Sequence, residues 1–106
     1  MTNRERIVRE FLLGFIKVHI LHHAAYGEIY GVAMMAELRN HGYDIGPSTM
    51  YPILHSLEKN GYLVRHERVV EGKVRKYYNI TLDGQQALRD IKAKINELVS
   101  EVMGDA

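Results

Sequence analysis

The segment from Gly46 to Gly61, GPSTMYPILHSLEKNG, decides the fold. Its apolar residues recur at intervals of three and four, which predicts a short helix with one buried face. These residues are Met50, Ile53, Leu54 and Leu57. The opposite face carries hydroxyl, phenol, imidazole and ammonium groups, on Ser48, Thr49, Tyr51, His55, Ser56 and Lys59. Hydrogen-bond donors without a carboxylate suit a DNA groove, so we interpret this segment as a recognition helix.

Pro52 restricts where this helix can begin. Proline is tolerated in the first helical turn, where its missing N–H would have had no partner. We therefore expect Thr49 to be the N-cap and Pro47 to belong to the preceding turn. This start would expose Thr49 and Tyr51 at the positive end of the helix, where backbone N–H groups suit a phosphate.

Two further helices are predicted before this segment. The first runs from Asn3 to Ala25, and the second runs from Tyr30 to His41, where Gly42 ends it. A short glycine-containing turn joins the second helix to the recognition helix, which predicts a helix-turn-helix. The core face of the second helix is expected to hold Val32, Met35 and Leu38 or Arg39, and Met34 is also a core candidate.

The first helix carries more apolar surface than one core contact needs. One face is traced by Ile7, Phe11, Gly14 or Phe15, Val18 and Leu21 or His22, and it is widened by Val8, Leu12 and Leu13. A surface helix in a small monomer needs only one apolar stripe. The surplus predicts a second packing partner for this helix.

A β-hairpin is predicted after the recognition helix, with strands in residues 62–70 and 73–81 around the turn Glu71-Gly72. A hairpin in this position is the wing of a winged helix. Alternation along the second strand would point one ring of Tyr77 and Tyr78 inward and the other outward. Between Lys59 and Lys76 there are six lysines and arginines against two glutamates, a net charge of +4 in a chain of net charge +1. Such a local basic patch suits a polyanion, and Lys73 and Arg75 lie near the wing tip.

A last helix is expected from Thr81 or Leu82 to about Met103. Its apolar residues are spaced by three and four, as in a heptad repeat, and they are Leu88, Ile91, Ile95, Leu98 and Val102. This seam is too short for a free coiled coil. We expect residues 82–106 to form a dimerisation helix that packs on the first helix of another subunit, and residues 1–81 to form the winged helix-turn-helix.

Composition narrows the function further. A chain of 106 residues forms one domain, and the absence of cysteine excludes disulfides and zinc–thiolate sites. No signal peptide or membrane-spanning run is apparent, so we expect a cytoplasmic protein without a membrane partner. The sequence holds no nucleophile–base pair, phosphate loop or paired acids at a site-forming spacing, and we expect neither an enzyme nor a cofactor.

Two ordered motifs resemble the PadR family of transcriptional regulators. Residues 49–63, TMYPILHSLEKNGYL, are similar to its T-x-Y-P-x-L-x-x-L-E-x-x-G signature, and residues 75–81, RKYYNIT, with Gly84, are similar to its R-K-Y-Y element. Tyr30-Gly31-Val32 resembles the Y-G-Y that opens the second helix, with Val32 in place of the second tyrosine. The length resembles that of family members with a single C-terminal helix.

The resemblance implies a dimeric winged helix that binds an inverted-repeat operator, most often as a repressor, with a dimer interface made by the first and last helices. It places Thr49, Tyr51 and His55 at the groove, and Lys73, Arg75 and Lys76 on the wing. Some family members bind aromatic or drug-like effectors at the dimer interface, which here would involve Phe11, Phe15 and the seam from Leu88 to Val102.

Two alternatives remain open from the residues alone. The first is a winged helix that contacts other proteins and not DNA. The second is a metal sensor built on His19, His22 and His23, because His19 shares a helix face with each of the other two.

Overall fold

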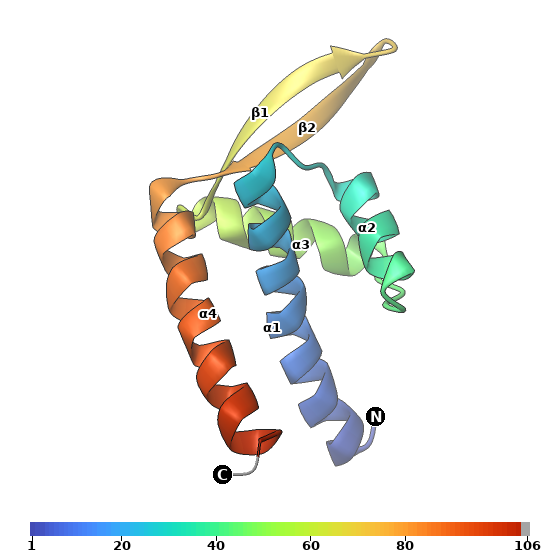
Figure 1. Cartoon of the computed structure of the whole chain (residues 1–106). Coiled ribbons are helices and arrows are strands. Elements are labelled where there is room, and N and C mark those ends of the chain that lie inside the picture. The colour runs from blue at the N-terminus through green and yellow to red at the C-terminus, as the bar shows by residue number, and fades with distance from the viewer. Residues whose placement is uncertain (105–106) are drawn as a thin grey trace.

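Helices packed against the base of one β-hairpin make up the fold in a computed structural model that describes residues 1–104 (Figure 1). The elements are α1 (Asn3–Tyr26), α2 (Gly31–Asn40), α3 (Pro47–Lys59), β1 (Leu63–Val70), β2 (Lys73–Ile80) and α4 (Leu82–Val102). Helices α1 and α4 run side by side, and the hairpin projects beyond their ends. The predicted fold class, mainly helical with a small hairpin, is confirmed. The last two residues of the predicted segment 82–106 lie outside the described residues.

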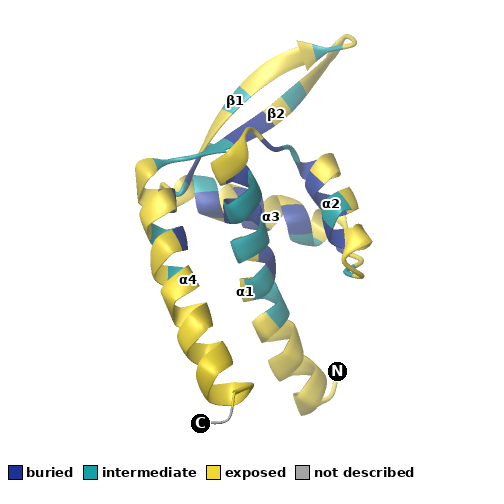
Figure 2. Ribbon diagram, viewed as in Figure 1, coloured by how far each residue is buried: buried dark blue, intermediate teal, exposed yellow. Residues whose placement is uncertain are grey.

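The core lies where α1, α2 and α3 meet the base of the hairpin (Figure 2). The four residues predicted to form the buried face of α3 are all buried. The largest fully buried side chains are Ile16, Ile20, Leu38, Met50 and Leu54. Figure 2 shows that the first turns of α1 and most of α4 lie outside this core.

The core face of α1 differs from the predicted stripe. Its buried residues are Ile16, Ile20, Leu21 and Ala24, of which only Leu21 belonged to that stripe. Phe11 is 64% exposed, Ile7 is also exposed, and Phe15 and Val18 are half-buried. Because residues 11–21 are apolar on more than one side, spacing alone could not identify the core face. The N-terminal part of the predicted stripe, at Ile7 and Phe11, is therefore surplus apolar surface.

Helix α2 packs through Met34, Met35 and Leu38, and Val32, predicted to face the core, is 61% exposed. The helix begins at Gly31, one residue later than predicted, so Val32 lies in its first turn. Gly42 follows the helix with φ +90°, a conformation that favours glycine, and its N–H donates to the Arg39 carbonyl at 3.0 Å.

Helix α3 begins earlier than predicted, so the assignment of Thr49 as N-cap is wrong. Gly46 is the N-cap in an extended conformation, and Pro47 is the first helical residue, where its fixed φ is favourable. The Met50 N–H donates to the Gly46 carbonyl at 3.0 Å and closes the first turn. Pro52 therefore lies in the second turn and has no N–H to donate to Ser48. The helix continues because its four buried residues hold it in the core.

The hairpin has the predicted strands and a two-residue turn at Glu71 and Gly72, with φ of 53° and 78°. Positive φ at both turn residues matches the right-handed twist of the flanking strands. This turn sets the register, which pairs Arg68 with Arg75. Ile29, in the α1–α2 loop, pairs with the other edge of β2 as a single-residue antiparallel bridge. The Ile29 N–H donates to the Tyr78 carbonyl at 2.9 Å, and the Tyr78 N–H donates to the Ile29 carbonyl at 2.8 Å.

Helix α4 is attached to the hairpin at its first turn. The Thr81 hydroxyl oxygen caps the helix by accepting from the Gly84 N–H at 3.0 Å, and the hydroxyl donates to the Gly61 carbonyl at 2.6 Å. Gly84 lies so close to the Tyr62 carbonyl that a Cβ there would collide with backbone. Within residues 1–104, none of the helices combines the length and apolar character needed to cross a membrane.

Candidate nucleic-acid interface

A groove of about 510 Å³ lies between the wing and the N-terminal turns of α2 and α3. It is lined by Tyr30, Gly31, Val32, Tyr51, Val70, Glu71, Lys73, Val74, Arg75 and Lys76. Four of the predicted DNA-binding residues, Tyr51, Lys73, Arg75 and Lys76, therefore meet at one place. The other four, Ser48, Thr49, His55 and Lys59, lie along α3 outside the groove, where Thr49 is half-buried and the rest are exposed.

Tyr51 crosses from α3 to the start of α2. A Cβ built on Gly31 would lie 2.6 Å from Cε1 and 2.9 Å from the hydroxyl oxygen of Tyr51, distances that real Cβ atoms do not reach. Only glycine therefore allows the ring this position. The Tyr51 side chain remains partly exposed beside the uncapped first turn of α2.

Tyr77 and Tyr78 are both buried, so the ring that strand alternation places on the outer face is not exposed to solvent. The two rings do lie on opposite faces of β2, and Tyr78 enters the core. Tyr77 is covered by other side chains: the Arg68 guanidinium lies 3.8 Å from its ring centroid, His66 stacks at 5.9 Å, and Tyr30 packs edge-on at 5.4 Å. The cation over an aromatic face is a favourable contact.

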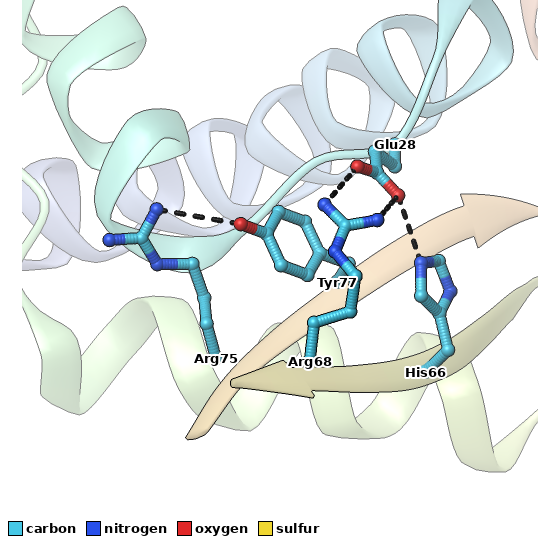
Figure 3. A network of polar contacts seen from close by, with 5 residues as sticks. All are labelled: Glu28, His66, Arg68, Arg75 and Tyr77. Atoms are coloured by element: carbon cyan, nitrogen blue, oxygen red, sulfur yellow. Dashed lines mark hydrogen bonds and ion pairs between the residues drawn. The ribbon is translucent and has the colours of Figure 1, made fainter. Parts of the chain in front are cut away.

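Glu28, in the loop between α1 and α2, holds this cover in place (Figure 3). Its carboxylate accepts hydrogen bonds from both terminal nitrogens of Arg68 and forms a third bond, 2.9 Å long, with Nε2 of His66. The Arg68 hydrogen bonds, followed by the His66 bond, keep the pKa of Glu28 below its usual value. Glu28 thus fastens the loop to β1, and the bridge from Ile29 to Tyr78 fastens it to β2.

Arg75 has a structural role as well as a place in the groove. Its guanidinium lies 4.5 Å from the ring centroid of Tyr30, and its Nη1 donates to the Tyr77 hydroxyl at 3.5 Å. Arg75 is half-buried, whereas Lys73 and Lys76 are exposed. The two lysines are therefore the more available cations at the groove.

A second, apolar groove of about 710 Å³ lies between α1 and α4. Phe11, Phe15, Leu88, Ile91 and Ile95 all line it. Leu88, grouped with the seam in the sequence, is only 5% exposed and belongs to the core of its own chain, whereas Leu98 is 48% exposed. The predicted seam thus divides into an inner end, which α1 already covers, and an exposed end that includes Ile95, Leu98 and Val102.

The histidines of α1 pack with residues that the sequence did not connect to them. His23 and His41 approach Glu37 at 3.6 and 3.1 Å, and the His19 ring lies 5.3 Å from that of His41. Burial, together with the nearby imidazoles of His41, His23 and His22, lowers the pKa of His19. Among residues 1–104 no group of three or more His, Cys, Asp or Glu is placed to hold a metal ion, so the metal-sensing alternative gains no support.

Sequence reasoning did not identify the residues that position the wing. The basic patch includes Arg68 but does not show its role, and nothing in the sequence pattern assigns Glu28, Tyr30 or His66 to the site. The turn Glu71-Gly72 was the available signal, because a two-residue turn implies that His66 pairs with Tyr77 and Arg68 with Arg75, as observed. No comparable signal marked Glu28.

Comparisons with known proteins agree with this geometry. Residues 20–90 match the model of the transcriptional regulator PadR-like family. The transcriptional regulator Rv3488 of Mycobacterium tuberculosis is 44% identical over 97 residues, which cover 92% of this chain and 91% of the relative. A PadR family transcriptional regulator from Eggerthella lenta has a similar crystal structure, with TM-score 0.76, 29% identity and coverage of 93% of this chain and 91% of the other.

A PadR-like transcriptional regulator from Bacillus cereus is similar as well, with TM-score 0.78, 26% identity and coverage of 88% and 92%. These likenesses extend over both the hairpin and the helices on either side of it. The hairpin after a helix-turn-helix, the two sequence motifs and the matched family model all lead to the same assignment. The chain belongs to the PadR-like family of transcriptional regulators.

Proposed function

We propose that this chain acts as a homodimer that binds an inverted-repeat operator and represses transcription in the cytoplasm. Two α3 helices related by a two-fold axis would enter successive major grooves about 34 Å apart. In this arrangement Thr49, Tyr51 and His55 face the bases, Ser48 and Lys59 lie beside the backbone, and the wing residues bind flanking phosphates.

The observation that carries the proposal is the groove where Tyr51 of α3 meets Lys73, Arg75 and Lys76 of the wing. A groove with three cations and a phenol beside the start of α2 suits a phosphate backbone. Its position next to the exposed polar face of α3 would allow one DNA duplex to contact both.

A salt titration of a fragment from the protein's own promoter tests this function. Lys73 and Lys76 of two protomers, each neutralising one phosphate, should contribute about −3.6 to the slope of log K against log salt. The double variant Lys73→Ala/Lys76→Ala should make the slope shallower by about that amount. A control variant, Lys94→Ala, removes a cation from α4, away from the groove, and should leave the slope unchanged.

The same titration separates the proposal from a winged helix that contacts only proteins. Binding to DNA that does not depend on salt, or no binding at all, would favour the protein-contact alternative. If the double lysine variant bound DNA with the same slope as the unaltered protein, the groove would not be the phosphate-binding surface.

We further propose that the dimer forms through α1 and α4. The exposed apolar residues Phe11, Ile95, Leu98 and Val102 support this, since a monomer would leave them in water. The apolar groove beside Phe15 is the proposed site for an aromatic effector that changes the angle between subunits and releases DNA. A panel of phenolic and cationic aromatic compounds that leaves promoter affinity unchanged would contradict the effector proposal without affecting the dimer.

A further inference from the structure

We infer that Arg68 is a further phosphate-binding residue, and that Glu28 occupies its guanidinium until a DNA phosphate replaces the carboxylate. The inference rests on the proposed DNA-binding function. It adds an internal anion that competes with DNA for one arginine of the wing.

Arg68 lies on the face of the hairpin that leads into the groove. It pairs directly with Arg75 across the hairpin, and side chains of directly paired residues point to the same face. Arg75 lines the groove together with Tyr51 and Lys73. A duplex that contacts Lys73 and Arg75 therefore passes the strand position that Arg68 occupies.

The Glu28 carboxylate holds Arg68 as a phosphate would. It accepts from both terminal nitrogens of the guanidinium, the two-pronged geometry that arginine forms with carboxylates and phosphates alike (Figure 3). The side chains are 47% and 34% exposed for Arg68 and Glu28, so water screens the pair and it contributes little to stability. A DNA phosphate, in contrast, gains from the release of bound counterions.

Neither group is left unsupported after the exchange. The Tyr77 ring lies under the Arg68 guanidinium at 3.8 Å, a contact that does not need the carboxylate. Glu28 keeps its 2.9 Å bond with Nε2 of His66. In the exchange, the Arg68 guanidinium leaves the Glu28 carboxylate and binds a DNA phosphate. This requires no change in the backbone of the wing.

The variant Glu28→Gln tests this inference through the salt dependence of promoter binding. Without the competing carboxylate, Arg68 is free to bind phosphate, and we expect severalfold tighter binding at low salt. In the unaltered protein, displacing Glu28 lowers the affinity for DNA, but Arg68 still reaches the phosphate. The number of phosphate contacts is therefore the same in both proteins, and the slope of log K against log salt for Glu28→Gln should stay within about half a unit of the unaltered value.

Arg68→Gln removes the contact itself. It should weaken binding and reduce the slope by about 0.9 for each protomer. The double variant Glu28→Gln/Arg68→Gln should bind no more tightly than Arg68→Gln, because Glu28 acts only through Arg68. The matched control is Glu97→Gln, which frees the exposed Lys94 on α4 by the same change of charge and should not alter promoter affinity.

Weaker binding by Glu28→Gln would overturn the inference, since it would make Glu28 a support for the wing and not a competitor. An unchanged slope in Arg68→Gln would also overturn it. Either result can occur while the unaltered protein binds its promoter with a steep slope. The failure of the inference is thus distinct from a failure of the proposed function, in which the unaltered protein itself shows no salt-dependent binding.

Discussion

The wing and helix α4 are attached to the same core by different chemistry. The base of the wing enters the core through Leu63 and Tyr78, but its outer part is held by hydrogen bonds, an exposed ion pair and rings packed on Tyr77. Helix α4 is held through Leu88, Gly84 and its capped first turn. Polar contacts at the surface respond to salt and to competing anions, and a buried apolar contact does not. The outer part of the wing, which is proposed to meet DNA, is therefore attached by contacts that DNA can perturb. Helix α4, which is proposed to join the subunits, is attached through a buried residue, Leu88, whose contacts DNA leaves unchanged.

The largest effect is expected from removing the apolar attachment of α4. Leu88→Ala should lower the free energy of unfolding by about 2–5 kcal/mol, because it opens a cavity in the core. Leu98→Ala makes the same chemical change on an exposed part of α4, and at concentrations where the chain is monomeric it should change that free energy by under about 0.5 kcal/mol. Urea unfolding measures both. Equal losses of unfolding free energy in the two variants would mean that Leu88 and Leu98 are equally buried. The proposed difference between the two ends of α4 would then be wrong.

The exposed end of α4 can be tested by placing a charge on it. Ile95→Glu should raise the dissociation constant of the proposed dimer by at least about thirtyfold, since about 2 kcal/mol is lost when an unpaired carboxylate enters an apolar interface. Sedimentation equilibrium gives the constant. Gln86→Glu adds the same charge to an exposed position of α4 outside the apolar groove and should leave the dimer intact. A dimer that tolerates Ile95→Glu is not formed through this surface.

The shape of the groove can be altered at Gly31 without changing its charge. In Gly31→Ala the new Cβ requires the Tyr51 ring to move, and we expect promoter affinity to fall by about tenfold, or about 1.4 kcal/mol. The double variant Gly31→Ala/Tyr51→Leu should bind no worse than Tyr51→Leu alone, because the colliding ring is gone. Filter binding at one salt concentration is sufficient. Full affinity in Gly31→Ala would show that the position of Tyr51 does not matter for DNA.

The smallest expected effect is on the pH dependence of stability, from His19, which packs near His41 where α1 meets the end of α2. Because the pKa of His19 is lowered in the folded chain, the unfolded chain binds more protons around pH 6. The contribution of neutral His19 to stability is therefore present at higher pH and is lost as pH falls below 6.5. His19→Gln should show a shallower loss of melting temperature between pH 8 and pH 5.5 than the unaltered protein. His55→Gln, on the exposed face of α3, should retain the full loss.

The sequence predicted local structure better than it predicted which surfaces meet. The buried face of α3 could be read from spacing because its other face is polar, and the two-residue turn determined the register of the hairpin. The core face of α1 could not be read in this way, because Ile16 and Ile20 stand among apolar residues on every side. The start of α3 was misplaced because Pro52 was assumed to need the first turn.

The polar network shows a different limit. Glu28 precedes its partners His66 and Arg68 by 38 and 40 residues, and no periodicity connects a loop residue to a strand so far along the chain. The backbone bridge between Ile29 and Tyr78 places the loop beside the sheet. The groove residues Lys73 and Arg75 were predicted because they lie in a basic run next to a turn, but the anchoring of Arg75 by Tyr30 depends on the same bridge.

The bridge at Ile29 also couples the position of α1 to that of the wing. Its C-terminal end is linked within three residues to β2, and its N-terminal half lies along the exposed apolar surface. A helix of 24 residues is about 36 Å long, so a tilt of about 5° around one end displaces the other by about 3 Å. A displacement of that size matches the length of a hydrogen bond. A tilt of about 5° around the N-terminal end of α1 would therefore displace the residues that carry the bridge to β2 by about one contact distance.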